Sequence, residues 1–163
     1  MSIAFSAGVI TVSDKGSRGE RVDVSGGVVR DLLETLPAQI AASTIVADEQ
    51  DAIAQAIIEY ADKKNLDIIV TTGGTGVSPR DVTPDATLRV IDREIPGMAE
   101  VMRLESLKKT PHAMISRAVV GIRKTSLIIN LPGSPKGASE NLSALMPALN
   151  HAVEKIKGDD SDC

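Results

Sequence analysis

The chain has 163 residues, 18 basic and 22 acidic side chains and a formal net charge of −4, a size that fits one domain with a sizeable core. With one Phe, one Tyr and no Trp, the core has to be aliphatic, and an aromatic stacking platform for single-stranded nucleic acid is excluded. Because the net charge gives no basic footprint for DNA or an anionic membrane, we expect a small-molecule ligand and neither of those partners.

The N-terminal segment is apolar, but it has no Lys or Arg before Lys15 and its apolar run is short. We interpret it as a first strand, Phe5 to Val12, and not as a signal peptide. No run approaches the roughly 20 apolar residues of a membrane span. The single cysteine, Cys163, leaves no internal disulfide and no cysteine-based metal site, which fits a cytoplasmic protein.

Strands and helices are predicted to alternate along the first part of the chain. Three runs rich in β-branched residues indicate strands, at 5–12, 40–46 and 66–72. Each precedes a segment with helical periodicity. The first helix is predicted to be capped by Ser25, the second to open at Asp51, and the third to run from a capping hydroxyl at Thr83, with Pro84 next, to about Arg93. This alternation is typical of a parallel sheet covered by helices on both faces.

The rest of the chain adds a hairpin and two helices. A short helix is predicted around Met98 to Leu107, and Val119 to Ile122 and Ser126 to Leu131 flank a short turn and predict an antiparallel hairpin. The last helix has its apolar side between 142 and 156, and Pro147 inside it predicts a kink or two abutting helices.

The predicted fold class is therefore α/β: a three-layer, Rossmann-like α/β/α sandwich with a mostly parallel sheet and one antiparallel hairpin. We expect a single domain over residues 1–157 and a flexible acidic tail over 158–163, which is poor in apolar residues.

The loop between the third strand and its helix, Thr71 to Pro84, is the most informative stretch. It contains Gly73, Gly74 and Gly76 with several hydroxyls and the pair Arg80-Asp81. Glycines allow backbone N–H groups to approach a ligand closely, which suits a phosphate or a polar heterocycle. The spacing fits neither a P-loop nor a dinucleotide fingerprint, because the lysine motif is missing and Pro79 occupies the place of the third glycine.

Polar residues also follow the other strands. Ser13-Asp14 ends the first strand, Asp48-Glu49 the second, and Asn130 with the segment 133–136 the last. Ligands of open α/β sheets bind beyond the carboxyl ends of the strands, so we expect these groups to converge there. Converging carboxylates require a cation, and Mg²⁺ bound by one or two carboxylates plus substrate phosphates is the usual one. Lys136, Ser134 or glycine N–H groups would then meet the phosphates.

Each of these residues also has a structural interpretation. Asp81 could be a turn residue ahead of a helix, and Asp14 and Asp48 could be polar ends of strands. His112 and His151 are isolated, which favours structural or surface roles for both.

Several motifs in order resemble one family, the molybdopterin adenylyltransferases of the MogA/MoaB type, which are related to the gephyrin G domain. The motifs are Gly73–Gly76 (GGTG), Arg80–Pro84 (RDVTP), Asp92–Gly97 (DREIPG) and Leu131–Lys136 (LPGSPK), with Val12-Ser13-Asp14 and Asp48-Glu49 matching earlier elements. The resemblance covers the chain from about Phe5 to Val153. One departure is Ala47, where relatives often have proline before the Asp-Glu pair.

The resemblance implies a protein that binds molybdopterin and, with ATP and Mg²⁺, transfers AMP to the terminal phosphate of molybdopterin and releases pyrophosphate. The two essential aspartates of the family resemble Asp48 and Asp81, which would be the catalytic residues and the Mg²⁺ ligands. The resemblance implies nucleotide contacts at Ser13, Asp14, Gly73, Gly74, Thr75 and Gly76. It implies pterin and phosphate contacts at Ser116, Ser134, Pro135 and Lys136.

The resemblance also implies a homotrimer and hand-over of the product to a molybdate-inserting enzyme. The alternative to an enzyme is a carrier paralogue that binds molybdopterin without catalysing transfer. Retention of both Asp48 and Asp81 favours the enzyme. A molybdate-inserting activity is disfavoured, because relatives with that activity carry extra domains for which this chain lacks the length.

Overall fold

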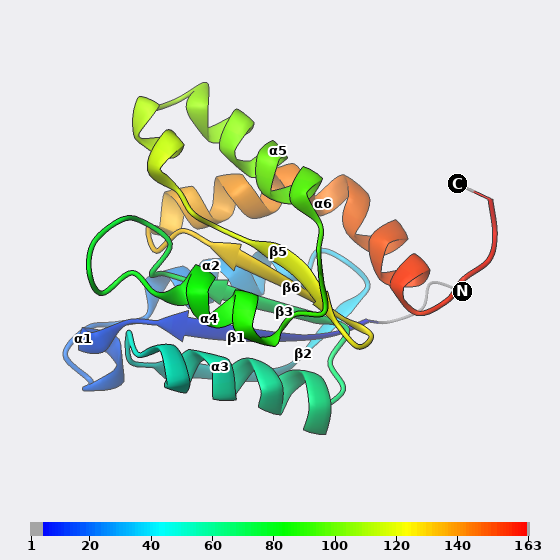
Figure 1. The fold of residues 1–163 in the computed structure, drawn as a ribbon, viewed down its shortest axis with the longest axis horizontal. Coiled ribbons are helices and arrows are strands. Elements are labelled where there is room, and N and C mark those ends of the chain that lie inside the picture. The colour runs from blue at the N-terminus through cyan, green and yellow to red at the C-terminus, as the bar shows by residue number, and fades with distance from the viewer. Residues whose placement is uncertain (1–4, 163) are drawn as a thin grey trace.

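The computed structural model describes residues 5–162 as a sheet between two helical layers (Figure 1). The strands are β1 Phe5–Val12, β2 Ala38–Val46, β3 Ile68–Thr72, β4 Arg93–Glu94, β5 Val120–Arg123 and β6 Ser126–Leu131. The α-helices are α1 Asp14–Ser17, α2 Val24–Leu33, α3 Gln50–Ile58, α4 Thr83–Val90, α5 Pro96–Leu107 and α6 Pro135–Ile156. A π-helical turn, Glu59–Lys63, continues α3, and a 3-10 helix, Pro111–Ile115, follows α5.

The sheet has the order β2-β1-β3-β6-β5-β4. The four strands β2, β1, β3 and β6 are parallel to one another, whereas β5 pairs antiparallel with both β6 and β4. Helices α3 and α4 cover one face and α2, α5 and α6 cover the other (Figure 1). The predicted fold class, a mostly parallel sheet with an antiparallel hairpin inside an α/β/α sandwich, is therefore confirmed.

Strand β3 explains why the central strands are continuous apolar runs in the sequence. Its residues are all buried, but successive side chains point to opposite faces. Ile68 and Val70 pack into the core under α2, α5 and α6, and Ile69 packs into the core under α3 and α4. Because both faces are covered, polar groups that could meet a ligand have to lie beyond the ends of these strands.

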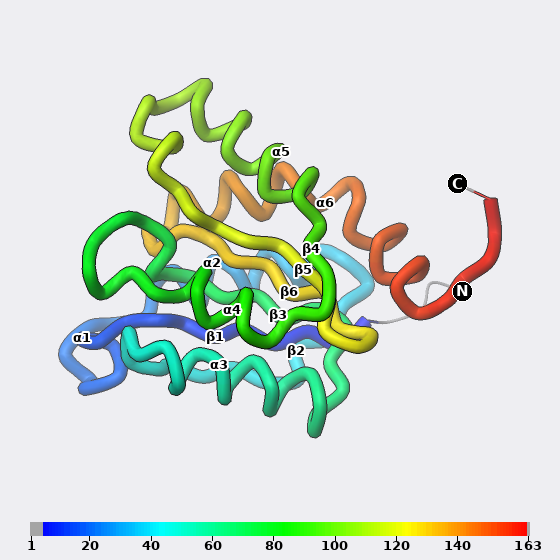
Figure 2. The backbone as a smooth tube through the Cα atoms, in the orientation of Figure 1, coloured from blue at the N-terminus to red at the C-terminus, as the bar shows by residue number. Residues whose placement is uncertain are grey.

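The carboxyl ends of the parallel strands lie at one end of the molecule, together with α1 and the loop between β3 and α4 (Figure 2). Strand β1 begins, and helix α6 ends, at the opposite end of the sheet. The loops that the sequence singled out are therefore gathered at one edge, as predicted.

Two local predictions are wrong, and a third had two alternatives. Helix α2 is capped by Asp23, whose side chain accepts from Gly26 N, and Ser25 Oγ donates instead to Gly133 O at 2.5 Å. Helix α4 ends at Val90 and not near Arg93, because Arg93 and Glu94 pair with β5 as an additional antiparallel strand. For Pro147, where a kink or two abutting helices were expected, the structure has a single helix, α6. Figure 1 shows α6 changing direction along its length, in line with the predicted kink.

Helix α6 ends at Ile156 with Lys157 as its C-cap, and 158–162 continue without regular structure. The flexibility of this tail stays a prediction, and Cys163 lies outside the described residues. Within residues 5–162, none of the helices combines the length and the apolar character that crossing a membrane requires.

Candidate functional site

The glycine loop leaves β3 in a conformation that requires glycine at two positions. Gly73 and Gly74 have φ of +110° and +69°, in the left-handed region. A Cβ on Gly73 would lie 2.3 Å from Val12 O, and one on Gly74 would lie 2.4 Å from Thr83 Oγ1. The loop is thereby packed directly against the ends of β1 and α4.

Thr83 closes this loop and does not cap the helix as predicted. Its hydroxyl donates to Gly73 O at 2.9 Å, and its N–H donates to Gly74 O at 3.1 Å. The N-cap position belongs to Val82, whose side chain makes no capping bond. The threonine therefore stabilises the glycine turn, because its hydroxyl has a buried carbonyl within reach.

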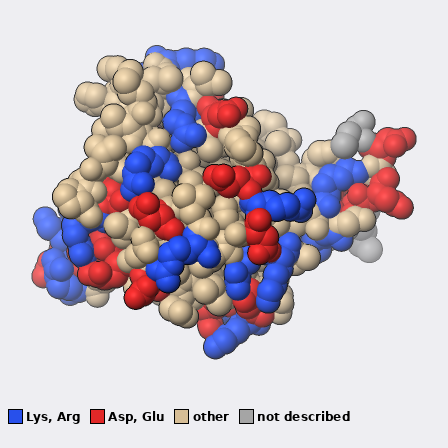
Figure 3. Space-filling view, in the orientation of Figure 1, with Lys and Arg blue, Asp and Glu red and all other residues tan. Residues whose placement is uncertain are grey.

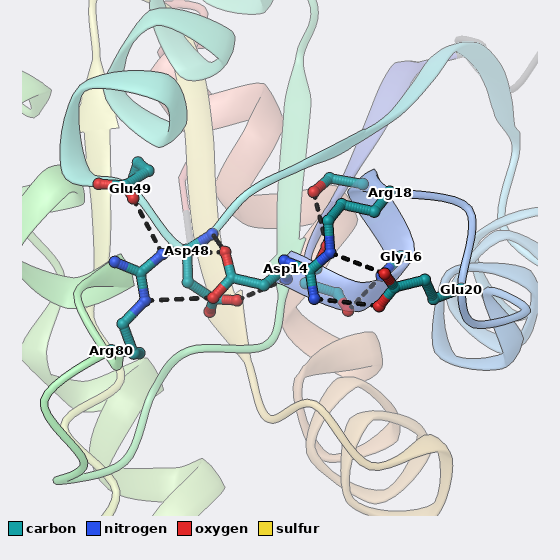
Figure 4. Close-up of polar contacts among 9 residues, drawn as sticks. Asp14, Gly16, Arg18, Glu20, Asp48, Glu49 and Arg80 are labelled. Carbon is teal, nitrogen blue, oxygen red and sulfur yellow. Dashed lines mark hydrogen bonds and ion pairs between the residues drawn. The ribbon is translucent and has the colours of Figure 1, made fainter.

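Asp14 and Asp48 form a reciprocal pair beyond the ends of β1 and β2 (Figure 4). The Asp14 N–H donates to Asp48 Oδ2 at 2.8 Å, and the Asp48 N–H donates to Asp14 Oδ1 at 2.9 Å. The two strands end side by side, with Val12 opposite Val46 in the register. Parallel pairing thus brings together two acids that are 34 residues apart.

Arg80 holds this pair from the glycine loop. Its Nε and Nη2 donate to the two carboxylate oxygens of Asp14 at 3.1 and 2.9 Å, and Nη2 also donates to Glu49 Oε1 at 2.9 Å (Figure 4). Bidentate pairing of this kind orients the carboxylate as well as stabilising it. The loop is therefore tied to the ends of β1 and β2.

The two aspartates of the pair differ electrostatically. Hydrogen bonds from Arg80 and from the Asp48 N–H lower the pKa of Asp14. Burial raises the pKa of Asp48, and the nearby negative charges of Asp14 and Asp81 act in the same direction. The negative charge of Asp14 is thus balanced by Arg80, whereas Asp48 lies where an additional positive charge would be stabilising.

Asp81 occupies a tight turn at the end of the loop. Its Oδ2 accepts from Ser78 N at 3.0 Å, and its own N–H donates to Ser78 O at 2.9 Å. A Cβ on Gly76 would lie 2.8 Å from Asp81 Oδ2, so the carboxylate packs against a position without a side chain. Asp81 is therefore a turn residue, and its charge also acts on Asp48.

The carboxylates fit a magnesium ion that shares its coordination with a substrate. Within residues 5–162, no group of three or more His, Cys, Asp or Glu side chains could hold a metal ion. Asp48 and Asp81 offer hard oxygen donors, and Mg²⁺ in phosphate-transferring sites takes one or two carboxylates with water and phosphate oxygens. These two residues would hold it only together with such a ligand.

Two cavities lie on either side of the glycine loop, with volumes of about 450 and 380 Å³, which is within the usual range for small-molecule sites. The larger one is lined by predicted residues that include Ser13, Asp48, Gly73, Gly74 and Pro135. The smaller one is lined by predicted residues that include Thr75, Gly76, Ser116, Ser134 and Lys136. Asp14 and Asp81 are in neither lining.

The wall between the cavities consists of 73–76 and 132–137. Thr72 Oγ1 donates to Pro132 O at 2.8 Å, and a Cβ on Gly133 would lie 3.3 Å from Gly73 Cα, so the two segments are in contact. Helix α6 starts there, with Ser134 Oγ accepting from Gly137 N at 3.0 Å. Its N-terminus adds partial positive charge to the wall, and Lys136, whose side chain is 84% exposed, adds a full one.

Asn130, which the sequence placed among the polar strand ends, does not reach the cavities. It is fully buried; its Nδ2 donates to Thr71 Oγ1 and Thr87 Oγ1 at 3.0 and 2.9 Å, and its Oδ1 accepts from Val119 N at 3.1 Å. Its role is to join β6 to β3, α4 and the start of β5.

Arg117 and Asp23 are site residues that the sequence did not reveal. Arg117 bonds to the glycine loop, and Asp23 lines the larger cavity while accepting from Thr11 Oγ1 at 2.8 Å. An exposed arginine and an acid in a charged loop carry no distinguishing pattern in a single sequence. Only their partners identify them, namely Gly76 O for Arg117 and Thr11 Oγ1 for Asp23.

Comparison with known proteins identifies the family of this chain. A family model described as "Probable molybdopterin binding domain" matches residues 8–151. The chain belongs to this family. A molybdopterin adenylyltransferase of Helicobacter pylori (strain J99) is 44% identical over 154 residues, which cover 93% of this chain and 87% of that protein. The resemblance identified from the motifs is therefore confirmed.

Two further relatives extend the comparison. The structure of the molybdopterin biosynthesis enzyme MoaB from Thermus thermophilus superposes with a TM-score of 0.90 at 50% identity, covering 95% of this chain and 98% of that one. Gephyrin of Dictyostelium discoideum is 40% identical over 159 residues, which are 91% of this chain but 22% of that protein. The match thus covers nearly the whole of the Thermus thermophilus chain and about a fifth of gephyrin.

Proposed function

We propose that this member of the molybdopterin-binding domain family is a molybdopterin adenylyltransferase in molybdenum cofactor biosynthesis. With ATP, it transfers AMP to the terminal phosphate of molybdopterin and releases pyrophosphate. The observation that carries the proposal is the shared wall 73–76, which has one cavity on each side. Two substrates in these cavities would bring their phosphates together at the glycine loop, beside Asp48.

The nucleotide is assigned to the larger cavity and the pterin to the smaller one. Ser13, Gly73 and Gly74 line the larger cavity. Asp14 does not line it, but its N–H donates to Asp48, which does. Ser116, Ser134 and Lys136 line the smaller one, along with apolar residues that suit a flat heterocycle. Thr75 and Gly76, expected on the nucleotide side, line the pterin side and would contact the phosphates from there, and Pro135 lines the nucleotide side.

The transfer is a direct displacement. A terminal phosphate oxygen of molybdopterin forms a bond to the α-phosphorus of ATP, and the bond from that phosphorus to the bridging oxygen breaks, so pyrophosphate leaves with the electron pair. The hydroxyls of Ser13 and Ser134 accept from the N–H groups of Gly16 and Gly137, and neither is paired with a base as a covalent nucleophile would need to be. The residues of the chain therefore act by positioning and by stabilising charge.

Each charged group has a place in this scheme. N–H groups of the glycine loop and Lys136 stabilise negative charge that develops on the phosphates. Asp48 and Asp81 would hold Mg²⁺, which neutralises phosphate charge when it is bound. Arg80 keeps Asp14 ionised and paired, and this orients Asp48 through the bond from the Asp14 N–H.

The test is release of pyrophosphate by the purified protein from ATP, Mg²⁺ and molybdopterin, with mass spectrometry of the adenylylated product. Wild type is expected to turn over, and Asp81→Asn is expected to keep the melting temperature and lose transfer. Turnover of Asp81→Asn at the wild-type rate would refute the role of Asp81. Binding of molybdopterin without any release by wild type would identify a carrier instead.

The assembly and partners follow as further proposals. We expect a homotrimer, supported by exposed apolar side chains on α5 and the 3-10 helix, namely Val101, Leu104, Leu107, Met114 and Ile115. Figure 3 shows little charge on the surface over that 3-10 helix. Sedimentation equilibrium should give the mass of three chains, and the mass of one chain would contradict the proposal. The product would pass to a molybdate-inserting enzyme, and a cytoplasmic location stays an expectation from the sequence.

A further inference from the structure

Arg117 binds the glycine loop and helix α4 through four groups at once. Its Nε donates to Gly76 O at 2.9 Å and its Nη2 to Asp81 O at 2.6 Å. Its Nη1 and Nη2 donate to the two carboxylate oxygens of Asp85 at 3.3 and 3.0 Å, and its backbone N–H donates to Thr75 O at 2.8 Å. One residue thus ties both ends of the segment 75–81 to the first turn of α4.

The contacts of Arg117 are directed at the loop and not at the core. Its side chain is 40% exposed and that of Asp85 is 41% exposed, so their ion pair contributes little to global stability. The two carbonyl bonds flank the carboxylate of Asp81, which itself rests against Gly76. Loss of the guanidinium would therefore loosen this segment more than it would destabilise the fold.

Arg117 also lies between two residues of the smaller cavity. Ser116 and Ala118 line that cavity on either side of it, while its guanidinium binds the loop. The geometry provides a direct link between the occupant of the cavity and the segment that carries Asp81. A shift of 116–118 on binding would be transmitted to the carbonyl of Asp81 through the hydrogen bond from the Arg117 guanidinium.

We propose that Arg117 is a positioning residue that sets Asp81 relative to the smaller cavity and so aligns the carboxylate with the phosphates. This inference rests on the proposed adenylyl transfer. Lysine cannot replace the arginine, because an ammonium group lacks the planar fork that reaches two carbonyls and a carboxylate together. The ion pair with Asp85 keeps the fork in place, and it also lowers the pKa of Asp85.

The experiment compares Arg117→Lys and Arg117→Gln with two controls. Arg89→Lys removes an exposed arginine of helix α4, whose partners Asp51 and Gln50 lie outside the loop. Asp85→Asn weakens the ion pair but leaves both carbonyl bonds available. For each variant we would measure kcat and KM with Mg-ATP and molybdopterin, the melting temperature, and amide hydrogen exchange without substrates.

The expected result separates positioning from general stability. Both Arg117 variants should lose about 10- to 100-fold in kcat, as misplacement of catalytic groups by up to about 1 Å does, with small changes in KM and in melting temperature. Exchange should rise in 73–82 and stay unchanged elsewhere. Arg89→Lys should match wild type, and Asp85→Asn should fall between wild type and the Arg117 variants.

Three outcomes would overturn the inference. The first is that both Arg117 variants keep the wild-type kcat and hydrogen exchange. The second is that Asp85→Asn loses as much kcat as they do. The third is that exchange in the Arg117 variants rises over the whole chain. If wild type itself released no pyrophosphate, the proposed function would fail. The exchange of 73–82 would in that case still show whether Arg117 holds the loop, so the two failures are distinguishable.

Discussion

The contact between Gly76 and Asp81 allows the carboxylate to be displaced without touching its chemistry. In Gly76→Ala, the added Cβ would lie 2.8 Å from Asp81 Oδ2, whereas ordinary contacts start at 3.4 Å. The oxygen therefore has to move by about 0.6 Å to restore an ordinary contact. This movement weakens the bond from Ser78 N, which is 3.0 Å long.

The change should affect activity much more than stability. A misplacement of 1 Å can cost about 100-fold in rate, so 0.6 Å corresponds to a loss of roughly tenfold in kcat. The weakened hydrogen bond costs about 1 kcal/mol. Alanine also restricts the unfolded chain, which returns about 0.4 to 1 kcal/mol, because Gly76 is not among the positive-φ glycines. The free energy of unfolding should thus change by less than about 1 kcal/mol.

The assay is steady-state release of pyrophosphate, together with urea unfolding of the same preparations. Gly97→Ala is the matched control, because a Cβ there meets nothing within 4 Å. It should keep the wild-type kcat and be slightly stabilised, since Gly97 lies in helix α5. A Gly76→Ala variant with the kcat of the control would refute the claim that the position of Asp81 matters.

Three further predictions concern pH, the buried network and the metal. Burial raises the pKa of Asp48 in the folded state above its ordinary value of 3.8, so ionised Asp48 costs folding free energy at neutral pH and nothing in acid below that value. Near neutral pH, Asp48→Asn should therefore unfold at a higher urea concentration than wild type, and this difference in midpoint should disappear as the pH falls through the folded-state pKa of Asp48. The variant should release no pyrophosphate. A difference in midpoint that grows in acid would contradict the prediction. Asn130→Ala leaves the buried Val119 N–H without its acceptor and two hydroxyls without their donor, so the free energy of unfolding should fall by about 2 to 4 kcal/mol, and an unchanged urea midpoint would count against the network. Chelation of Mg²⁺ by EDTA should stop transfer without lowering the melting temperature of the substrate-free protein, whereas a lowered melting temperature would indicate a structural metal.

The fold could be predicted because local patterns and packing agree. The β3 run is apolar since both faces of the sheet are covered, and helices α2 and α3 show their buried faces through regular spacing. The hairpin of β5 and β6 is joined by a short turn, so its pairing is local. The convergence of Asp14 and Asp48 could be predicted because the carboxyl ends of parallel strands lie at the same edge of a sheet, whereas the pairing of β1 with β2 is seen only in the structure.

What could not be predicted depends on partners distant in the sequence. Strand β4 has two residues and exists because β5 offers a free edge to Arg93 and Glu94. Thr83 satisfies every local rule for a helix cap, but a tertiary acceptor, Gly73 O, competes for its hydroxyl. Arg117 looks like a solvated charge until the loop carbonyls are seen around it. The division of the site into two cavities likewise arises from the contact of 73–76 with 132–137.

The central claim is that two substrates occupy the two cavities and meet at the glycine loop. A crystal structure of the Asp81→Asn variant with ATP and molybdopterin tests it most directly, because transfer should be blocked while both ligands bind. We predict the adenosine in the cavity lined by Ser13 and Gly74, the pterin in the cavity lined by Ser116, and the α-phosphate between them beside Gly73–Gly76. Phosphates lying away from residues 71–81, or both ligands in one cavity, would contradict the account.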